Sequence, residues 1–513
     1  CLIYITNKKV SSVELADNEY DLLVIGGGVN GTGIAADAAG RGLKVLLCEQ
    51  SDLACATSSN SSKLIHGGLR YLEHYEFRLV KEALAEREVL LKNAPHIMWP
   101  LTFRLPHQKH LRPAWMIRIG LFMYDNLAKR ETLAGSRSIK FGENSVLEPS
   151  ITKGFEYSDG WVDDSRLVIL NALAAQQKGA VITTQTKCVN AKREQGKWQV
   201  TLEQQKSKAK YTISAKGIVN AAGPWVAKLF DEALTEKSPQ NIRLVKGSHI
   251  VVPRIHDEKQ AYILQNKDQR IVFVIPFEDD FSLIGTTDVE HKGEAQDVKI
   301  SDEEIDYLID ITNTYFKQPI KREDIVHTFS GVRPLLDDES VNAQAVTRDY
   351  KLELSSDAKQ TPLLSVFGGK ITTYRKLAEA AVNKLEDFYP QMSNAWTKHS
   401  PLPGGDFSSV EALKSELKAK YEWLPEITLK RFVRTYGTRA KHILGSATGL
   451  SDLGQDFGHG LFAAEVDYLL NEEWAENAYN ILWRRSKLGL RFNEAQVAAL
   501  NDYIEHNQAA KSA

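Results

Sequence analysis

The sequence predicts an α/β fold, with α+β character where an antiparallel sheet joins it, and three observations support this prediction. A short apolar run leads into a glycine motif and then into small residues at helical spacing, all within residues 21–40. Short apolar segments separated by turn residues recur between residues 243 and 288, and after residue 405 the pattern becomes helical. These features indicate a Rossmann-type dinucleotide-binding domain, an inserted antiparallel sheet and a C-terminal helical domain.

The nucleotide-binding motif begins with the apolar residues 21–25, which are typical of a buried parallel strand. They lead into a GxGxxG pattern at residues 26–31, followed by small residues that let a helix approach the sheet closely. A second strand ends at Glu49, about 18 residues after Gly31, close to the roughly 20 expected for an acid that binds an adenosine ribose. The pyrophosphate should therefore lie on the helix N-terminus, and a simple glycine-rich turn is the less favoured alternative.

The fingerprint alone does not distinguish FAD from NAD, because both cofactors contain adenosine diphosphate. The next segment, residues 56–71, is polar, contains glycine and is too long for an ordinary strand-to-helix connection. We expect it to wrap around the rest of the cofactor, with a serine-rich linker as the alternative. The sequence has no second GxGxxG fingerprint for a nicotinamide cofactor, so the electrons are expected to leave by another route.

Composition restricts the class of protein. With 513 residues, 43% apolar and 25% charged residues and a net charge of −2, the chain is expected to be globular and multi-domain, and not a nucleic-acid binder. Four cysteines without a CxxC pair suggest neither disulfides nor a metal site, which fits a cytoplasmic protein. The apolar N-terminal run is too short for a signal peptide, and no run of residues is long enough to span a membrane.

Three longer motifs carry a resemblance to a known family: residues 61–73 (SSKLIHGGLRYLE), 331–335 (GVRPL) and 367–375 (FGGKITTYR). With them the chain resembles, over nearly its whole length, the aerobic FAD-dependent glycerol-3-phosphate dehydrogenases. These are a branch of the glycine-oxidase and D-amino-acid-oxidase-like flavoproteins. The resemblance implies a noncovalent FAD and oxidation of sn-glycerol 3-phosphate to dihydroxyacetone phosphate by hydride transfer to FAD. It also implies ubiquinone or a similar quinone as the electron acceptor, in glycerol catabolism.

The resemblance further implies which residues contact FAD. These residues lie in the glycine fingerprint, in the serine-rich segment that follows it, on a strand near residue 189 and in the later family motifs. They are Gly26, Gly28, Asn30, Gly31, Glu49, Thr57, Ser58, Ser62, Lys63, Leu64, Gly67, Gly68, Val189, Ala222, Gly223, Trp225, Gly331, Gly369, Ile371 and Thr372.

The implied substrate contacts form a cationic group suited to a phosphate dianion. They are Arg70, Tyr71, His249, Arg333, Arg348 and Lys370. We assign proton acceptance to His249, because an imidazole with a pKa near 6.5 can accept a proton at neutral pH whereas a guanidinium cannot readily do so. Arg333 would then stabilise the developing alkoxide. A water molecule acting as the base is the alternative, since a cationic pocket lowers the pKa of the histidine.

The positions of the motifs predict the domains. A discontinuous FAD-binding domain is expected from residues 17–95, 150–240 and 330–395, with a substrate or cap domain formed by 96–149 and 241–329. Residues 400–513 form the predicted helical domain after a Pro- and Gly-rich break. We interpret it as a packing or dimerisation module, so a homodimer is among the expected assemblies.

Residues 104–130 combine apolar and aromatic residues with six basic side chains and one acidic side chain. The segment is typical of an interfacial helix, although a buried core helix with a basic rim fits the sequence equally well. The resemblance favours the first interpretation, because ubiquinone is dissolved in the bilayer. It implies peripheral attachment to the cytoplasmic face of the inner membrane.

The sequence is also compatible with two other functions. A glycerol-3-phosphate oxidase would share the substrate and FAD motifs but would reduce oxygen to peroxide. A non-catalytic FAD-binding protein is the second alternative, and the cationic group disfavours it.

Overall fold

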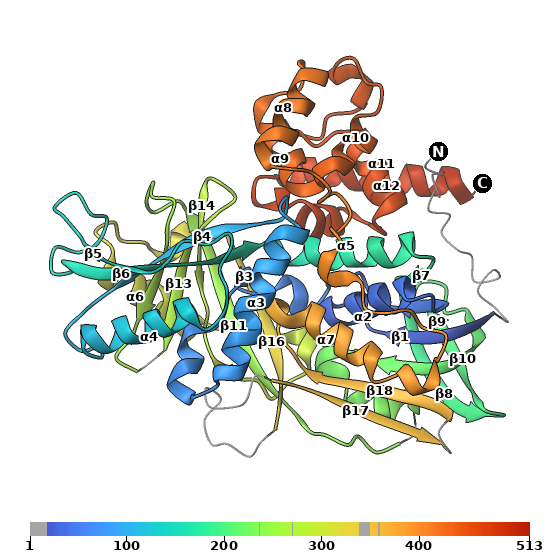
Figure 1. Ribbon diagram of the computed structural model, residues 1–513. Helices are drawn as coiled ribbons and strands as arrows, with labels where there is room; N and C mark the ends of the chain where they lie inside the picture. The colour runs from blue at the N-terminus through green and yellow to red at the C-terminus, as the bar shows by residue number, and fades with distance from the viewer. Residues whose placement is uncertain (1–17, 235, 269, 338–348, 358–359, 513) are drawn as a thin grey trace.

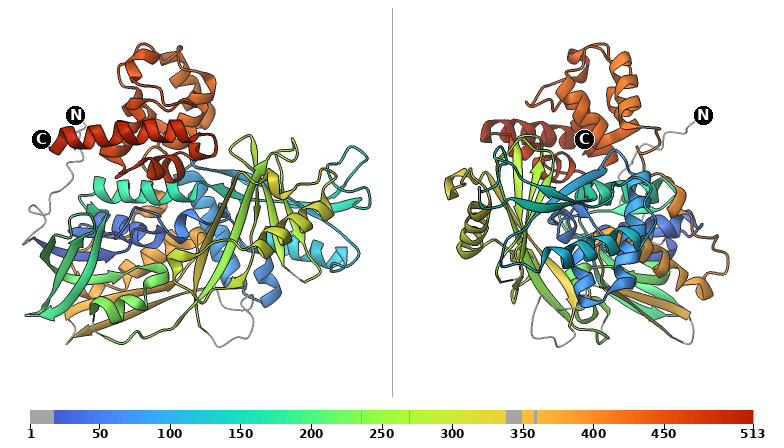
Figure 2. Two further views of the ribbon diagram at one scale, coloured as in Figure 1. Left: turned by 180° about the vertical axis from the view of Figure 1, so that it is seen from behind. Right: turned by 60° about the vertical axis from the view of Figure 1, so that its left-hand side comes forward.

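The computed structural model describes residues 18–512, apart from residues 235, 269, 338–348 and 358–359. Two sheets lie side by side, and a helical domain formed by the C-terminal part of the chain lies above the region where they meet (Figure 1). Figure 2 shows the same arrangement from behind and from the side. The predicted α/β class, with its antiparallel sheet and C-terminal helical domain, is confirmed.

The first sheet has a parallel centre. Its strand order is β17-β18-β10-β1-β2-β7, and the hairpin β8–β9 joins it through β10. The bounds are β1 (Glu19–Ile25), β2 (Val45–Cys48), β7 (Val181–Thr183), β8 (Thr186–Glu194), β9 (Lys197–Gln204), β10 (Lys210–Asn220), β17 (Tyr350–Asp357) and β18 (Gln360–Gly368).

Both faces of β1 are buried, which explains its continuous apolar sequence. Leu22 and Val24 pack against three helices that cover one face, α2 (Val29–Gly40), α5 (Asp164–Gln177) and α7 (Tyr374–Asn383) (Figure 1). Leu23 and Ile25 pack on the other face, where the core includes Trp198 and Phe230. The carboxyl end of β1 is thereby fixed against the start of α2.

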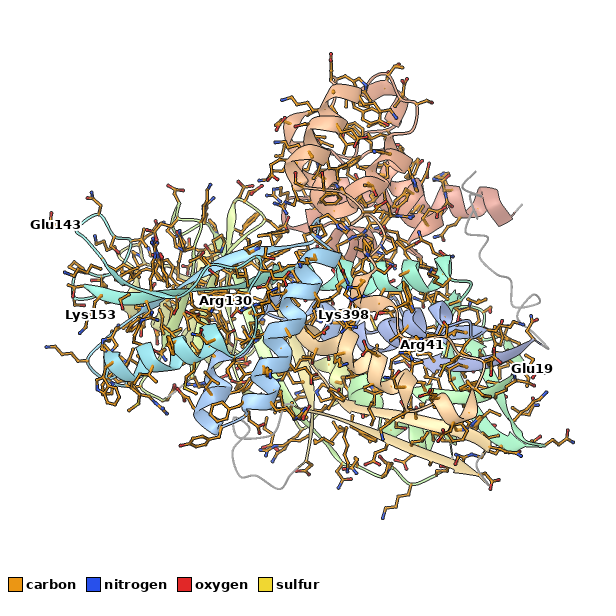
Figure 3. All side chains as sticks on the ribbon, viewed as in Figure 1. Glu19, Arg41, Arg130, Glu143, Lys153 and Lys398 are labelled. Atoms are coloured by element: carbon orange, nitrogen blue, oxygen red, sulfur yellow. The ribbon has the colours of Figure 1, made fainter. Side chains whose placement is uncertain are left out.

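The second sheet is largely antiparallel, with the order β15-β11-β14-β13-β12-β4-β6-β3, β16 beside β11 and β5 beside β6. Its strands are β3 (Leu64–Ile65), β4 (Met98–Pro106), β5 (Arg137–Lys140), β6 (Lys153–Val162), β11 (Ile242–Pro253), β12 (Ala261–Gln265), β13 (Ile271–Phe277), β14 (Phe281–Gly285), β15 (Val289–Glu290) and β16 (His327–Leu336). Glu143 and Lys153 lie at its outer end, on the opposite side of the molecule from Glu19 of β1 (Figure 3).

The second sheet also takes strands from chain segments that the sequence analysis grouped with the cofactor domain. β3 and β6 pair with each other, and β16 pairs along its whole length with β11. Three helices flank this part of the molecule: α3 (Phe77–Asn93), α4 (Ala114–Asn126) and α6 (Asp302–Tyr315). The chain therefore crosses between the two sheets several times, which brings distant residues to their junction.

The C-terminal helical domain has its own hydrophobic core, which includes Leu417, Phe432 and Val466. Its helices are α8 (Val410–Lys420), α9 (Glu426–Tyr436), α10 (Ala440–Leu444), α11 (Ala463–Glu472) and α12 (Glu494–Ser512). Buried ion pairs connect it to the rest of the chain, including Arg485 with Asp52.

Candidate active site

A cavity of about 480 Å³ lies at the carboxyl end of β1 and the N-terminus of α2. Gly26 has φ +115°, a conformation that L side chains rarely adopt, and a Cβ atom on Gly31 would lie 1.9 Å from the carbonyl oxygen of Gly26. The first residues of α2 line the cavity. Gly28 at its N-cap has no side chain to cap the helix, and Ser58 Oγ accepts from the Val29 amide at 3.0 Å. Unpaired amides and the helix dipole at such an end favour an anion, so the cavity fits the pyrophosphate of a dinucleotide.

Glu49 lies at the end of β2, on the wall of the same cavity. Its carboxylate accepts hydrogen bonds from the amides of Gly27 (2.7 Å) and Ser51 (2.8 Å). Burial raises the pKa of this carboxyl group, and the two amide hydrogen bonds oppose that change. Oε1 also accepts from Cys55 Sγ at 3.7 Å, and the second lone pair of Oε2 fits a ribose hydroxyl.

Most of the predicted cofactor residues line this cavity. They are Gly26, Gly28, Asn30, Glu49, Thr57, Ser58, Ala222, Gly223, Trp225, Gly369, Ile371 and Thr372. Four others, Ser62, Leu64, Gly68 and Gly331, line a second cavity of about 470 Å³ that shares several residues with the first. The two cavities together leave an elongated space for a dinucleotide and a substrate.

The remaining predicted cofactor residues lie behind these walls or beside them. Gly31 acts through its close approach to Gly26. The amide of Gly67 donates to the Tyr124 hydroxyl at 2.8 Å, away from both cavities. Val189 lies at an irregularity of β8, where its neighbours Lys187 and Cys188 line the cavity instead. Lys63 borders a third cavity, of about 410 Å³, beneath the helical domain.

The predicted substrate residues gather where the first two cavities meet. Tyr71 and Arg333 line both cavities, Arg70 and His249 line the second, and Lys370 lines the first. The Lys370 ammonium lies 3.9 Å from the centre of the Tyr71 ring, a cation–π contact. Arg348 lies outside the described residues.

His249 is held on three sides. It lies on β11, between Gly285 of β14 and Phe329 of β16. Its ring stacks on Phe329 at 4.7 Å between ring centres, and its Nε2 atom lies 2.9 Å from Ser62 Oγ. Burial lowers the pKa of His249 well below its ordinary value, and the charges of Arg333 and Lys63 lower it further. The imidazole is therefore neutral at neutral pH, as a proton acceptor must be.

Arg333 is held by two residues that sequence reasoning did not identify. Its Nη1 atom lies 2.6 Å from the Asp288 carboxylate, and its Nη2 atom donates to Thr286 Oγ1 at 3.1 Å. Both partners follow β14, whereas Arg333 lies on β16, so only the pairing of the strands with β11 brings them together. Asp288 thus balances part of the positive charge of the cluster.

Two family models together match most of the chain. The model of the FAD-dependent oxidoreductase (DAO) family matches residues 21–375, and that of the C-terminal domain of alpha-glycerophosphate oxidase matches residues 395–510. An aerobic glycerol-3-phosphate dehydrogenase of Escherichia coli is 58% identical, with 95% of this chain and 98% of that protein covered. The chain belongs to the FAD-dependent glycerol-3-phosphate dehydrogenase family. The resemblance inferred from the sequence is therefore confirmed, and the cofactor of this family is FAD.

Two further proteins are similar over nearly the whole chain. A D-erythritol 1-phosphate dehydrogenase of Brucella abortus is 50% identical, covering 95% of this chain and 98% of the relative. The structure of a glycerol-3-phosphate dehydrogenase from Bacillus halodurans complexed with FAD has a TM-score of 0.74 at 25% identity. It covers 98% of this chain and 97% of that one.

Two glycines of this flavoprotein fold leave room for the site residues. A Cβ atom on Gly285 would lie 2.2 Å from His249 Cδ2, and a Cβ atom on Gly247 would lie 2.6 Å from an Arg333 guanidinium nitrogen. Gly285 ends one of the segments interpreted as strands, and a glycine there is a signal of close approach.

Asp164, whose carboxylate pairs with Lys63, was also missed, although a pair of acidic residues after an apolar run marks a helix N-terminus.

Proposed function

We propose that this protein oxidises sn-glycerol 3-phosphate to dihydroxyacetone phosphate. The observation that carries the proposal is a buried histidine, His249, which lines the second cavity together with Arg333, a residue that also lines the FAD cavity. Bound FAD supplies the hydride acceptor. The names of the relatives that are 57% and 58% identical support the same substrate.

Each side chain has a defined role in this proposal. The substrate hydroxyl gives its proton to the neutral imidazole of His249, and Ser62 orients the ring through its contact with Nε2. Arg333 stabilises the negative charge that develops on the substrate oxygen. Arg70 and Lys370, together with Arg348, bind the phosphate, for which arginine provides paired donors.

An anaerobic titration tests the proposal. Glycerol 3-phosphate should bleach the flavin absorbance at about one equivalent, whereas glycerol, which lacks the phosphate, should not. D-erythritol 1-phosphate is the second substrate to compare, because of the Brucella relative. Stoichiometric peroxide formation in air would identify an oxidase, and an unbleached flavin would overturn the proposed activity.

We also propose that a quinone takes the electrons and that the protein attaches peripherally to the cytoplasmic face of the inner membrane. Among the described residues no helix is long and apolar enough to cross a bilayer. On α4, however, the side chains of Trp115, Ile119 and Phe122 are 63%, 51% and 61% exposed. Their spacing places them on one face, whereas Leu121 and Tyr124 are buried. This pattern supports an interfacial helix rather than a core helix.

The position of α4 supports the same proposal. It lies on the side of the molecule away from the helical domain (Figures 1 and 2). The segment around its start also borders the second cavity, where Leu111 and Ile117 join Leu105, Ile263 and Phe273 in an apolar wall. An apolar acceptor that leaves a bilayer at α4 would therefore reach the site along apolar surface.

The basic residues near α4 contribute less surface charge than the sequence suggests. Arg104 pairs with Glu156 and Glu258, and Arg130 pairs with Asp125. Arg112 and Lys129 are exposed, although each has a carboxylate within 3.3 Å. We therefore expect the apolar face to contribute more to membrane binding than the charges do.

A further inference from the structure

Asp164 is a fully buried carboxylate that accepts four hydrogen bonds. One oxygen accepts from the Lys63 ammonium at 2.8 Å and from the amide of Ser165 at 2.9 Å. The other accepts from the amide and the hydroxyl of Ser61, at 3.1 and 2.7 Å. Burying a carboxylate is costly unless its lone pairs are satisfied, and here they are satisfied mainly by one short segment, Ser61 to Lys63.

That segment carries Ser62, the residue in contact with His249. Both neighbours of Ser62 in the chain are tied to Asp164, and the amide of Lys63 also donates to Ser61 Oγ at 3.0 Å. Lys63 has φ +59°, a left-handed conformation that is uncommon for a residue other than glycine. Such a conformation persists where surrounding contacts fix it, and the ion pair with Asp164 is such a contact.

The same lysine faces the histidine through an aromatic ring. The Lys63 ammonium lies 5.2 Å from the centre of the Phe329 ring, and Phe329 stacks on His249. The cation, the ring and the imidazole are therefore linked by consecutive contacts. Asp164 fixes the position of that cation as well as the backbone that carries Ser62.

The residue before Asp164 connects this arrangement to the helical domain. Asp163 caps α5 and pairs with Lys487 at 3.1 Å, and Lys487 also donates to Ser165 Oγ at 2.6 Å. Lys487 is 6% exposed. A residue of the C-terminal helical domain thus holds the turn that carries Asp164.

We infer that Asp164 is a positioning residue for the His249–Ser62 pair, and that the C-terminal helical domain supports it through Lys487. Asp164 lines none of the three cavities, so it acts through other residues. The inference rests on the proposed function, because it takes His249 as the proton acceptor. It gives the helical domain a part in catalysis in addition to packing.

The first experiment compares Asp164→Asn with Asp37→Asn, both as FAD-loaded protein. Asp37 is another fully buried carboxylate, paired with Arg41 on α2, so it controls for the loss of a buried charge. In Asp164→Asn the rate constant for anaerobic flavin reduction by glycerol 3-phosphate should fall about 100-fold, because a misplaced catalytic group loses about this much. The Kd for the substrate and the FAD content should change less than about threefold.

The pH profile separates positioning from general destabilisation. With a positioned base, the reduction rate levels off above the pKa of that base. In Asp164→Asn, as in His249→Asn, the rate should instead keep rising with pH, because hydroxide must remove the proton. Unchanged reduction per bound flavin, or an unchanged profile shape, overturns the inference.

Milder variants keep the test informative if Asp164→Asn does not fold. Ser61→Ala removes one of the four hydrogen bonds and should slow flavin reduction about tenfold with the same change of profile. Lys487→Met should slow it several-fold, whereas Lys430→Met, which removes an exposed ion pair between the helical domain and Asp279 in the turn after β13, should not. Equal rates for Lys487→Met and Lys430→Met refute the role of the helical domain.

Failure of the proposed function can be distinguished from failure of the inference about Asp164. If glycerol 3-phosphate does not reduce the flavin of the unaltered protein, the proposed activity is wrong. If His249→Asn is as fast as the unaltered protein, the assignment of the base is wrong. A slow His249→Asn beside a fast Asp164→Asn contradicts only the inference about Asp164.

Discussion

Gly31 is the residue at which one added methyl group should weaken FAD binding most. A Cβ atom there would lie 1.9 Å from the Gly26 carbonyl oxygen, and both positions are fixed by backbone, so no side chain can rotate away. We predict that Gly31→Ala loses most of its bound FAD, measured as the ratio of flavin to protein absorbance. Gly120→Ala is the control, because that helical glycine faces open space. Stoichiometric FAD in Gly31→Ala would refute this close-packing argument.

Protonation of His249 should produce the acid limb of the pH profile, which is the fall in activity at low pH. Burial, Arg333 and Lys63 all lower its pKa, so protonation, and with it loss of the base, occurs below the ordinary value near 6.5. We predict that kcat/KM for glycerol 3-phosphate is constant through neutral pH and falls only at pH values below about 6.5. In Arg333→Gln the limb should move to higher pH, because one neighbouring positive charge is removed, in addition to a lower plateau. A limb that stays in place would show that Arg333 does not act on the base.

At the scale of one element, α4 should decide membrane attachment. Replacing Trp115, Ile119 and Phe122 by Ser removes its exposed apolar face while leaving its buried residues intact. We predict that binding to vesicles of anionic lipid, measured by flotation, falls at least about tenfold, a change that corresponds to about 1.4 kcal/mol. Quinone reduction should fall with it, whereas activity with a soluble artificial acceptor should survive.

The matched control for α4 is Ile427→Ser. This side chain is 70% exposed on α9, in the helical domain on the other side of the molecule. It should leave flotation unchanged. Equal losses in the two variants would mean that general surface hydrophobicity, and not α4, causes binding.

At the scale of the whole molecule, buried ion pairs connect the helical domain to the FAD-binding part. Arg485 is fully buried and donates to Asp52 at 2.8 Å and to the carbonyl oxygen of Glu473 at 2.6 Å, and Glu473 pairs with Arg166. Asp52 belongs to the loop that follows Glu49, so this network reaches the cofactor cavity. Without Arg485, Asp52 keeps its ion pair with Arg484 but loses its contact with the Arg485 guanidinium, and the carbonyl oxygen of Glu473 loses this donor.

We predict that Arg485→Met lowers the free energy of unfolding by about 1.5 to 3 kcal/mol, because hydrogen bonds to a buried charge are lost. Denaturation should be followed by tryptophan fluorescence and by flavin release, and both signals should change at lower denaturant concentration. Lys430→Met, which removes an exposed ion pair between the helical domain and the turn after β13, should change stability by less than about 1 kcal/mol. If the fluorescence midpoint falls while flavin release does not move, the network does not support the cofactor site.

Much of the cofactor half of this protein follows from local sequence. The strand, the glycine turn, the close-packed helix and Glu49 occur within residues 21–49, and their spacing reflects contacts between neighbouring elements. A continuous apolar run indicates a strand buried on both faces, as β1 is, and the family motifs point to the residues that meet at the two cavities. Local periodicity also predicts the helical domain, because its helices form a core of their own.

The catalytic arrangement depended on pairings between distant parts of the chain. Ser62 and His249 are 187 residues apart, and Lys63 and Asp164 are 101 residues apart. Neither spacing leaves a local signal in the sequence. The chain crosses several times between the two sheets, and only these crossings bring β3, β6 and β16 into the second sheet. The exposure of α4 is a similar case, since an amphipathic sequence fits both a core and an interface until neighbouring elements cover one face. Local periodicity thus determined the elements, and long-range packing decided which side chains meet.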